Sequence, residues 1–276
     1  MPVARRRRAR RRHRRLWTTR LRRRRRRRGP ADAAAPPDAA INAGFGEPIA
    51  LGLGGSDPWL ARDGLELWFD QPAPYELWSA RRGALAEAFA APVLATTLNS
   101  AGAETDPSLS ADGLELVFVS DRDGAERLYQ AARASAAADF AAAPIVMRGL
   151  EATPVHAAAW AGADTLYLTD DAGGLARATR AARGAPFAPP TSVGAPAVGW
   201  PTVSAGELEL FAEAFPDGAG TIVWATRAQA GDAFVRRGVL DFAPPCADGA
   251  LADPQLTDDD HTLVLRCGGD IYVARR

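Results

Sequence analysis

Five residues stand directly before prolines that recur along the chain, and their side chains could bind a charged or cyclic ligand. They are Asp57, Asp106, Thr153, Trp200 and Asp253. Three carboxylates brought to one place could hold a cation or a basic peptide, and an indole could stack on a sugar or another ring. The alternative is structural, because an aspartate before a proline can start a strand by accepting hydrogen bonds from nearby backbone amides.

Histidine chemistry has few candidates in this sequence. The histidines are His13, His156 and His261, and acids adjoin a histidine in the run at residues 258–261. A zinc site or a histidine-activated nucleophile needs several convergent partners. The run stands where other copies of a repeat have an Asp-Gly turn, so we expect a charged turn, with no metal site and no cofactor.

The two cysteines, Cys246 and Cys267, both lie in the last fifth of the chain. They are 21 residues apart, which excludes a CxxC metal site. If the protein is exported, a disulfide between them could brace the last repeat. The alternative is a pair of free, half-buried thiols.

The proline-led phrases form a repeat that must position all of these residues. The copies read DPWLARDGLELWF, DPSLSADGLELVF, TPVHAAAWAGADTLYL, WPTVSAGELELF and DPQLTDDDHTLVL. Their prolines are 49, 47, 47 and 53 residues apart. In four copies an arginine is followed seven residues later by a phenylalanine, at Arg82 and Phe89, Arg133 and Phe140, Arg180 and Phe187, and Arg227 and Phe234. This period is typical of propellers and solenoids.

Each copy contains four short segments with the alternation of half-buried strands, separated by turn residues such as Asp63 and Gly64. Four antiparallel strands in about 47 residues make one propeller blade. The fifth copy ends at Arg276 before its fourth strand, while residues 45–53 form an unpartnered strand before the first copy. We therefore predict an all-β, five-bladed β-propeller whose ring is closed by the N-terminal strand. A sixth blade has no residues to form it, and an open solenoid would leave the leading strand unpaired.

Residues 105–133, TDPSLSADGLELVFVSDRDGAERLYQAAR, resemble the repeat of the propeller domain of TolB and related WD-like bacterial proteins. The family's serine-aspartate-arginine-x-glycine turn corresponds here to residues 120–124. The resemblance extends in weaker form over residues 45–276. It implies a binding scaffold for partner proteins in the periplasm or at the cell surface, and it carries over no binding residues.

Charge is distributed unevenly along the chain, although the formal net charge is zero. Residues 5–28 hold 17 of the 33 arginines, so the rest of the chain has 16 arginines against all 33 acids, a balance near −17. An acidic body of this kind should repel nucleic acid. We divide the chain into an arginine-rich tail at residues 1–30, an Ala/Pro linker at 31–44 and a single propeller domain at 45–276.

The arginine-rich tail has three interpretations. A disordered arm could bind nucleic acid or anionic lipid. A targeting segment or membrane helix is not expected, because no apolar stretch follows the charges. The third interpretation is an artefact of translating GC-rich DNA upstream of the true start.

Two classes of function fit these observations. The first is a non-enzymatic, monomeric scaffold of the cell envelope that binds a protein, peptide or glycan. The alternative is a propeller hydrolase or lyase acting on glycans or lactones, with acids drawn from Asp57, Asp106 and Asp253. The sequence has no GxSxG motif, no repeated Asp-box and no histidine-rich metal shell, which favours the scaffold.

Overall fold

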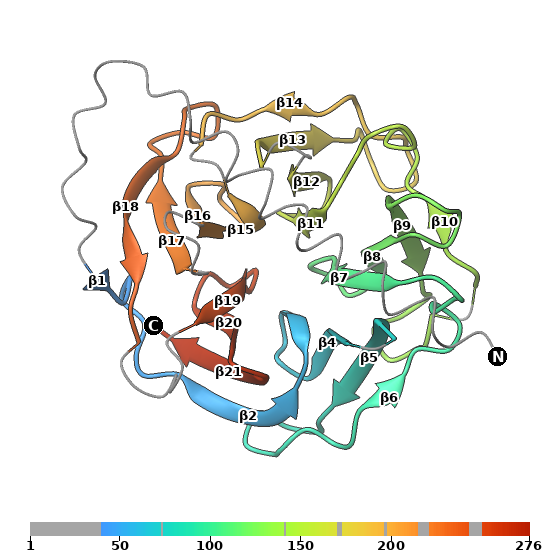
Figure 1. Cartoon of the computed structure of the whole chain (residues 1–276), viewed down its shortest axis with the longest axis horizontal. Coiled ribbons are helices and arrows are strands. Elements are labelled where there is room, and N and C mark those ends of the chain that lie inside the picture. The colour runs from blue at the N-terminus through green and yellow to red at the C-terminus, as the bar shows by residue number, and fades with distance from the viewer. Residues whose placement is uncertain are drawn as a thin grey trace.

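Five β-sheets stand around a common axis in the computed structural model (Figure 1). It describes residues 40–72, 74–140, 142–169, 173–195, 198–214, 221–242 and 250–276. In each sheet the first strand of the repeat lies nearest the axis and the fourth lies at the rim. The predicted five-bladed propeller of four-stranded antiparallel blades is confirmed, and the described part of the chain has no helix suited to crossing a membrane.

The blades follow one another in chain order. Blade 1 contains β3 (Ser56–Leu60), β4 (Glu66–Gln71), β5 (Glu76–Arg81) and β6 (Val93–Leu94). Blade 2 contains β7 (Glu104–Leu109), β8 (Glu115–Ser120), β9 (Arg127–Ala132) and β10 (Ile145–Val146). Blade 3 contains β11 (Ala157–Trp160), β12 (Thr165–Thr169), β13 (Leu175–Thr179) and β14 (Thr191–Ser192).

Two blades combine residues from both ends of the described chain. Blade 4 contains β15 (Gly199–Val203), β16 (Glu209–Ala214), β17 (Thr221–Thr226) and β18 (Val235–Leu240), with β1 (Ala40–Ile41) added at its rim. Blade 5 contains β19 (Leu251–Leu256), β20 (Thr262–Cys267), β21 (Asp270–Arg275) and β2 (Ile49–Gly54). The prediction that the N-terminal strand completes the last blade is therefore confirmed.

Local sequence explains how each blade folds. In β4, Leu67 and Phe69 are fully buried on one face and Trp68 is 4% exposed on the other, because a second strand has a neighbouring blade on each side. The turn before β4 uses Asp63, whose carboxylate accepts a hydrogen bond from the Leu65 amide at 2.9 Å, and Gly64, which has a φ of 72°. Glycine adopts this left-handed conformation without steric cost, so the hairpin is encoded within a few residues.

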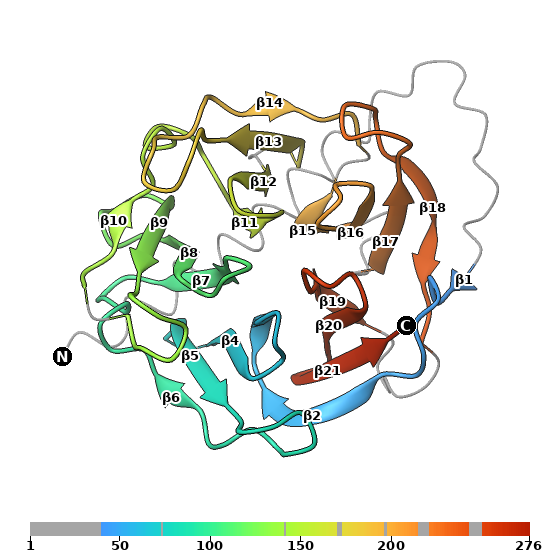
Figure 2. The same ribbon diagram turned by 180° about the vertical axis from the view of Figure 1, so that it is seen from behind.

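The first described strand and the C-terminus come together at the rim of blades 4 and 5, where the C-terminus lies beside β1 and β18 in both views (Figure 2). Ala40 and Ile41, which we expected in a linker, pair in parallel with Val239 and Leu240 of β18. Phe45 is 1% exposed, and the guanidinium of Arg276 lies 4.7 Å from its ring centroid. This pair is the fifth copy of the Arg–Phe repeat, completed between the segment that precedes β2 and the C-terminal residue.

The other four Arg–Phe pairs explain the seven-residue spacing seen in the sequence. Each arginine stacks over its phenylalanine at 4.3 to 5.3 Å, in the pairs Arg82–Phe89, Arg133–Phe140, Arg180–Phe187 and Arg227–Phe234. Such contacts are favourable when the cation is withdrawn from water. They place the arginines at the joints between successive blades.

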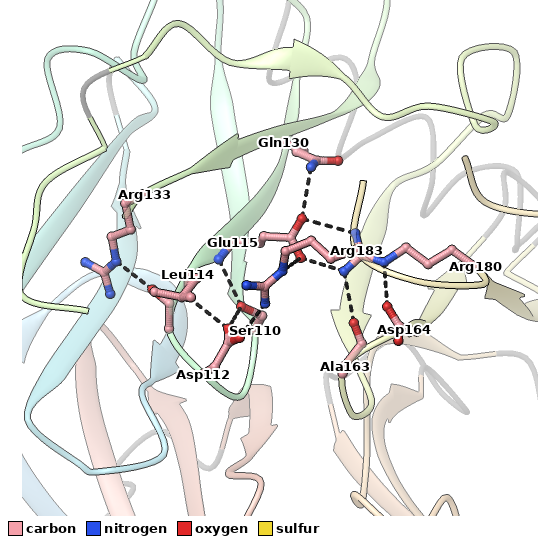
Figure 3. A network of polar contacts seen from close by, with 11 residues as sticks. Ser110, Asp112, Leu114, Glu115, Gln130, Arg133, Ala163, Asp164, Arg180 and Arg183 are labelled. Carbon is pink, nitrogen blue, oxygen red and sulfur yellow. Dashed lines mark hydrogen bonds and ion pairs between the residues drawn. The ribbon is translucent and has the colours of Figure 1, made fainter. Parts of the chain in front are cut away.

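Three joints carry a bidentate ion pair that links one blade to the next, and two of these pairs are buried. Arg133 of blade 2 donates to both carboxylate oxygens of Glu66 of blade 1, at 3.0 and 2.6 Å. Arg180 of blade 3 contacts Glu115 of blade 2 in the same way, at 3.1 and 2.5 Å (Figure 3). Arg276 binds Glu209 of blade 4 through both oxygens as well. Bidentate geometry of this kind orients neighbouring blades.

Candidate functional site at the channel mouth

The residues before the prolines come together where the inner strands begin. A cavity of about 40 Å³ is lined there by residues of all five inner strands. They include Asp57, Asp106, Ala157, Trp200 and Asp253, together with the prolines Pro58, Pro107, Pro201 and Pro254. We call these nine residues the acidic mouth.

Four of the inner strands have a β-bulge at the residue that lines the cavity. The register with the second strand shifts at Asp57, Asp106, Trp200 and Asp253, and each of these residues has a positive φ, between 45° and 55°. A bulge redirects a side chain out of the regular alternation. Aspartate tolerates this conformation better than most residues, whereas a bulky aromatic in it is an outlier, so Trp200 is strained.

Blade 3 departs from the pattern, and Thr153 is not among the residues that line the cavity. Its inner strand, β11, pairs with β12 without a register shift, and Trp160 faces Leu166 just as Leu60 faces Leu67 in blade 1. Counting back from Trp160 gives Ala157 as the equivalent of Asp57. Pro154 lies upstream of the strand in this copy. The prediction that Thr153 lines the mouth was therefore wrong by four residues.

Two further acids and an arginine stand behind the mouth on the second strands. Asp70 is completely buried and Glu213 is 4% exposed. Glu213 accepts a hydrogen bond from the Asp253 amide at 2.7 Å, and Arg266 donates to Asp253 Oδ2 at 2.5 Å. The Asp57 amide donates to the same Asp253 oxygen at 3.2 Å, which links blades 5 and 1.

The carboxyl groups of the mouth compete for protons because they exceed the cations near them. Burial, followed by repulsion from Asp106, Asp253 and Asp70, raises the pKa of Asp57 well above its usual range. Burial and repulsion from Asp253 likewise raise the pKa of Glu213. Burial also opposes ionisation of Asp253, but Arg266 outweighs it and lowers the pKa. The site therefore combines a firmly ionised carboxylate with neighbours that retain protons.

Some atoms of the mouth have no hydrogen-bond partner among the described residues. They include Oδ1 of Asp57 and Oδ1 of Asp253, both of which are covered from solvent. Buried acceptors are rarely left without a donor, and each such case calls for an explanation. A donor supplied by a ligand would satisfy them.

The sequence predicted the cavity-lining residues of the first strands but did not predict the charged residues of the second strands that contact them. Asp70, Glu213 and Arg266 occupy equivalent positions, four residues into the second strands of blades 1, 4 and 5. The available signal was a charged residue near the end of an otherwise apolar strand. That signal becomes interpretable once the register between strands is known.

The other predicted features lie away from the mouth. Asp259 accepts hydrogen bonds from the His261 amide and the Thr257 hydroxyl, so residues 258–261 form a turn. Among the described residues, no group of three or more His, Cys, Asp or Glu side chains could hold a metal ion. Cys267 is buried at the end of β20, whereas Cys246 lies outside the described residues, so the disulfide stays a prediction. The tail at residues 1–30 also lies outside them.

Comparisons with known proteins place the chain among β-propellers. No protein-family model matches the sequence, and no curated protein sequence matches it. The catalytic domain of the Coprinopsis cinerea GH62 alpha-L-arabinofuranosidase is similar in structure, with a TM-score of 0.58 at 13% identity over 85% of this chain and 98% of that one. An alpha-L-arabinofuranosidase from Podospora anserina gives a TM-score of 0.57 at 12% identity, over 88% and 95%.

Similar solved structures also include TolB proteins, which bear the repeat that the sequence resembles. TolB from Acinetobacter baumannii has a TM-score of 0.48 at 14% identity. The match covers 80% of this chain and 54% of that chain, so the present chain corresponds to about half of that protein's length. At these identities the similarity to the two arabinofuranosidases shows the fold alone, and function must be argued from the site itself.

Proposed function

We propose that this protein is a non-enzymatic propeller that binds a basic side chain of a partner protein or peptide at its acidic mouth. The observation that carries the proposal is the excess of carboxyl groups there. Asp57, Asp106 and Asp253 line the cavity and Asp70 and Glu213 lie behind it, while Arg266 contacts Asp253. A cation entering the mouth would relieve the repulsion among these groups.

The size of the cavity favours the tip of a side chain over a larger ligand. Pockets for small molecules usually enclose roughly 300–1,000 Å³. The cavity here is about 40 Å³, which suits an ammonium or guanidinium group at the end of a flexible chain. Oδ1 of Asp57 lacks a donor among the described residues, and a lysine or arginine would supply one.

Trp200 supports the same ligand class. It lines the cavity at the position that an aspartate occupies in blades 1, 2 and 5, and its backbone has a φ of 45° there. Strain of this sort is retained where the surrounding structure enforces it, often at binding sites. The face of an indole attracts cations, and tryptophan does so best of the aromatic residues.

The hydrolase alternative has one observation in its favour. The pKa of Asp57 is raised and that of Asp253 is lowered, and a pair with opposite shifts can act as acid and base. Asp253, however, is 3% exposed and is engaged by Arg266 and the Asp57 amide, so it is poorly placed to reach a substrate. Binding therefore explains the site better than catalysis.

The proposal is tested by NMR titration with a short peptide that carries one lysine, compared with the same peptide carrying norleucine. We expect the lysine peptide to shift the Trp200 indole resonance and the norleucine peptide to leave it unchanged. The double variant Asp57→Asn with Asp106→Asn should weaken binding at least about tenfold, since each close charge contact contributes on the order of 1 kcal/mol.

Asp139→Asn is the matched control, because its side chain is 93% exposed and it lies outside the mouth. Equal binding of the two peptides, or equal binding by the double variant and the wild type, would contradict the proposal. Hydrolysis of an aryl arabinofuranoside by the wild type that is lost in the double variant would favour the enzyme instead.

A further inference from the structure

Among the described residues, the joint between blades 5 and 1 lacks the carboxylate that every other joint supplies. In blades 1, 2 and 4 the second strand begins with a glutamate, and that glutamate receives the arginine of the next blade. In blade 5 the second strand begins with Thr262. By the repeat, the arginine of blade 1 that is equivalent to Arg133 of blade 2 is Arg82, which stacks on Phe89 as Arg133 stacks on Phe140. A threonine hydroxyl cannot neutralise a guanidinium.

Blade 3 shows how the chain compensates when a threonine takes this position. There Thr165 begins the second strand, and Glu207 of blade 4 supplies the carboxylate. Glu207 accepts from Arg227 at 3.3 Å and from Arg177 at 2.7 Å. Glu207 stands two residues before β16, and the corresponding position two residues before β4 is Gly64, which has no side chain to offer.

Arg82 nevertheless makes the same kinds of backbone and ring contacts as the arginines that form ion pairs at the other joints. Its Nε donates to the Gly64 carbonyl at 2.8 Å, its Nη1 donates to the Leu85 carbonyl at 3.1 Å, and its guanidinium lies 4.5 Å from the Phe89 ring centroid. Arg133 has the same Nε contact, to the Gly113 carbonyl. Among the described residues, no carboxylate bonds to Arg82, although its geometry is prepared for one.

A second arginine stands on the other side of this position. Thr262 pairs across the sheet with Arg275, just as Glu66 pairs with Arg81 in blade 1, where Arg81 donates to the glutamate at 2.9 Å. Arg275 is exposed, and none of its side-chain contacts involves an acid among the described residues. Burial, followed by repulsion from Arg275, lowers the pKa of Arg82, as expected for two cations near each other without an anion between them.

We propose that the joint between blades 5 and 1 binds a carboxylate from outside the ring, between Arg82 and Arg275 and beside the hydroxyl of Thr262. The ligand would take the place that the carboxylate of Glu66 occupies between Arg133 and Arg81. A planar carboxylate matches the fork of a guanidinium, which presents two parallel donors.

This carboxylate site is distinct from the acidic mouth. Thr262 lies at the end of its blade next to the turn between the first and second strands, whereas the mouth lies where the first strands begin. The two sites therefore occupy opposite ends of the ring and take ligands of opposite charge. Neither proposal depends on the other.

The test is thermal unfolding in sodium acetate and in sodium chloride at equal ionic strength. Acetate at about ten times its Kd should raise the unfolding midpoint of the wild type by about 3 °C relative to chloride. Arg82→Gln should abolish this difference. Thr262→Glu should abolish it too, because the chain then supplies its own carboxylate, and its midpoint should exceed that of Thr262→Gln by about 2–4 °C.

Three outcomes would overturn the proposal. One is an acetate response of the same size in the wild type, Arg82→Gln and Thr262→Glu. Another is a Thr262→Glu midpoint no higher than that of Thr262→Gln. The third is a larger response to phosphate than to acetate, which would assign the site to a tetrahedral anion. A peptide carrying one glutamate then distinguishes an acidic partner, which should bind more tightly than acetate, from a small free carboxylate.

Discussion

Acidic residues have different surroundings at the two ends of the propeller. One end is the acidic mouth; the other, which we call the turn end, carries the turns between the first and second strands of each blade. At the turn end, Glu66 and Glu115 are buried and each accepts two hydrogen bonds from an arginine of the next blade. At the mouth, Asp57 and Asp106 line a cavity among other acids, and burial together with repulsion from those acids raises the pKa of Asp57. Acidic side chains therefore hold blades together where an arginine pairs with them, and are available to a ligand where no cation does.

This difference has an energetic basis. A buried ion pair is costly to break because the remaining charge stays buried without a partner. A cluster of like charges instead favours any change that removes a charge or adds a cation. Substitutions at the two ends should therefore have effects of opposite sign on stability.

The largest effect is expected at the turn end. Replacing Arg133 with alanine should lower the free energy of unfolding by about 3–5 kcal/mol, because Glu66 would lose its bidentate partner inside the joint. Arg133 has a side chain with 0% exposure. Urea denaturation monitored by tryptophan fluorescence measures the change.

Arg81 is the matched control, since it contacts the same glutamate from a side chain that is 41% exposed. Arg81→Ala should cost less than about 1 kcal/mol, as exposed pairs do. Equal losses from the two variants would mean that burial does not distinguish them, and the comparison between the ends would fail.

A somewhat smaller loss is expected where Phe45 contacts the C-terminal residue. Phe45→Ala should destabilise the ring by about 3 kcal/mol, because it removes a buried ring that contacts Arg276 and packs edge-on against Phe211 at 5.9 Å. Phe89→Ala, at the equivalent half-buried position of blade 1, should cost less. A loss for Phe45→Ala no greater than that for Phe89→Ala would show that closure adds nothing to stability.

The smallest effect, and the one of opposite sign, is expected at the mouth. The folded pKa values of Asp57 and Glu213 lie above their unfolded values, so above about pH 4 the folded state retains protons that the unfolded state has released. The free energy of unfolding should therefore fall as pH rises toward those raised values. Asp57→Asn should reduce this fall and stabilise the protein at pH 7.

Unfolding curves collected from pH 4 to 8 measure that slope, with Asp139→Asn as the control. Asp253 contributes in the other direction, because its lowered pKa gives stability that is lost only as pH falls below the ordinary aspartate range. A steeper slope in Asp57→Asn than in the wild type would contradict the repulsion among the carboxyl groups of the mouth.

The blades were predictable from local patterns. Alternating residues such as Leu67 and Phe69, and Asp-Gly turns such as Asp63 and Gly64, encode strands and hairpins within a few residues of chain. The orphan strand before the first repeat and the gap after Arg276 predicted the closure. The ring position of blade 3 was not predictable in this way, because Ala157 is identified by its pairing with β12 and its proline stands elsewhere.

The back of the site depended on contacts between distant parts of the chain. Asp70, Glu213 and Arg266 lie on three different blades, and the effect of each on Asp57 or Asp253 follows from burial and distance. Their residue types alone do not reveal which acids are neutralised. Likewise Arg82 has the same sequence spacing to its phenylalanine as Arg133, yet it lacks the glutamate that Arg133 receives from the preceding blade.

By itself, then, the sequence determined the number of blades, their strands and their turns, because these depend on interactions among neighbouring residues. Only the tertiary structure decided which charges are paired and which remain available to a ligand. Ion pairs across blade joints join residues as far apart in the sequence as Glu66 and Arg133, and the contact between Arg276 and the Phe45 ring joins residues still farther apart. Electrostatic energy depends on distance and burial, and both are properties of the folded ring.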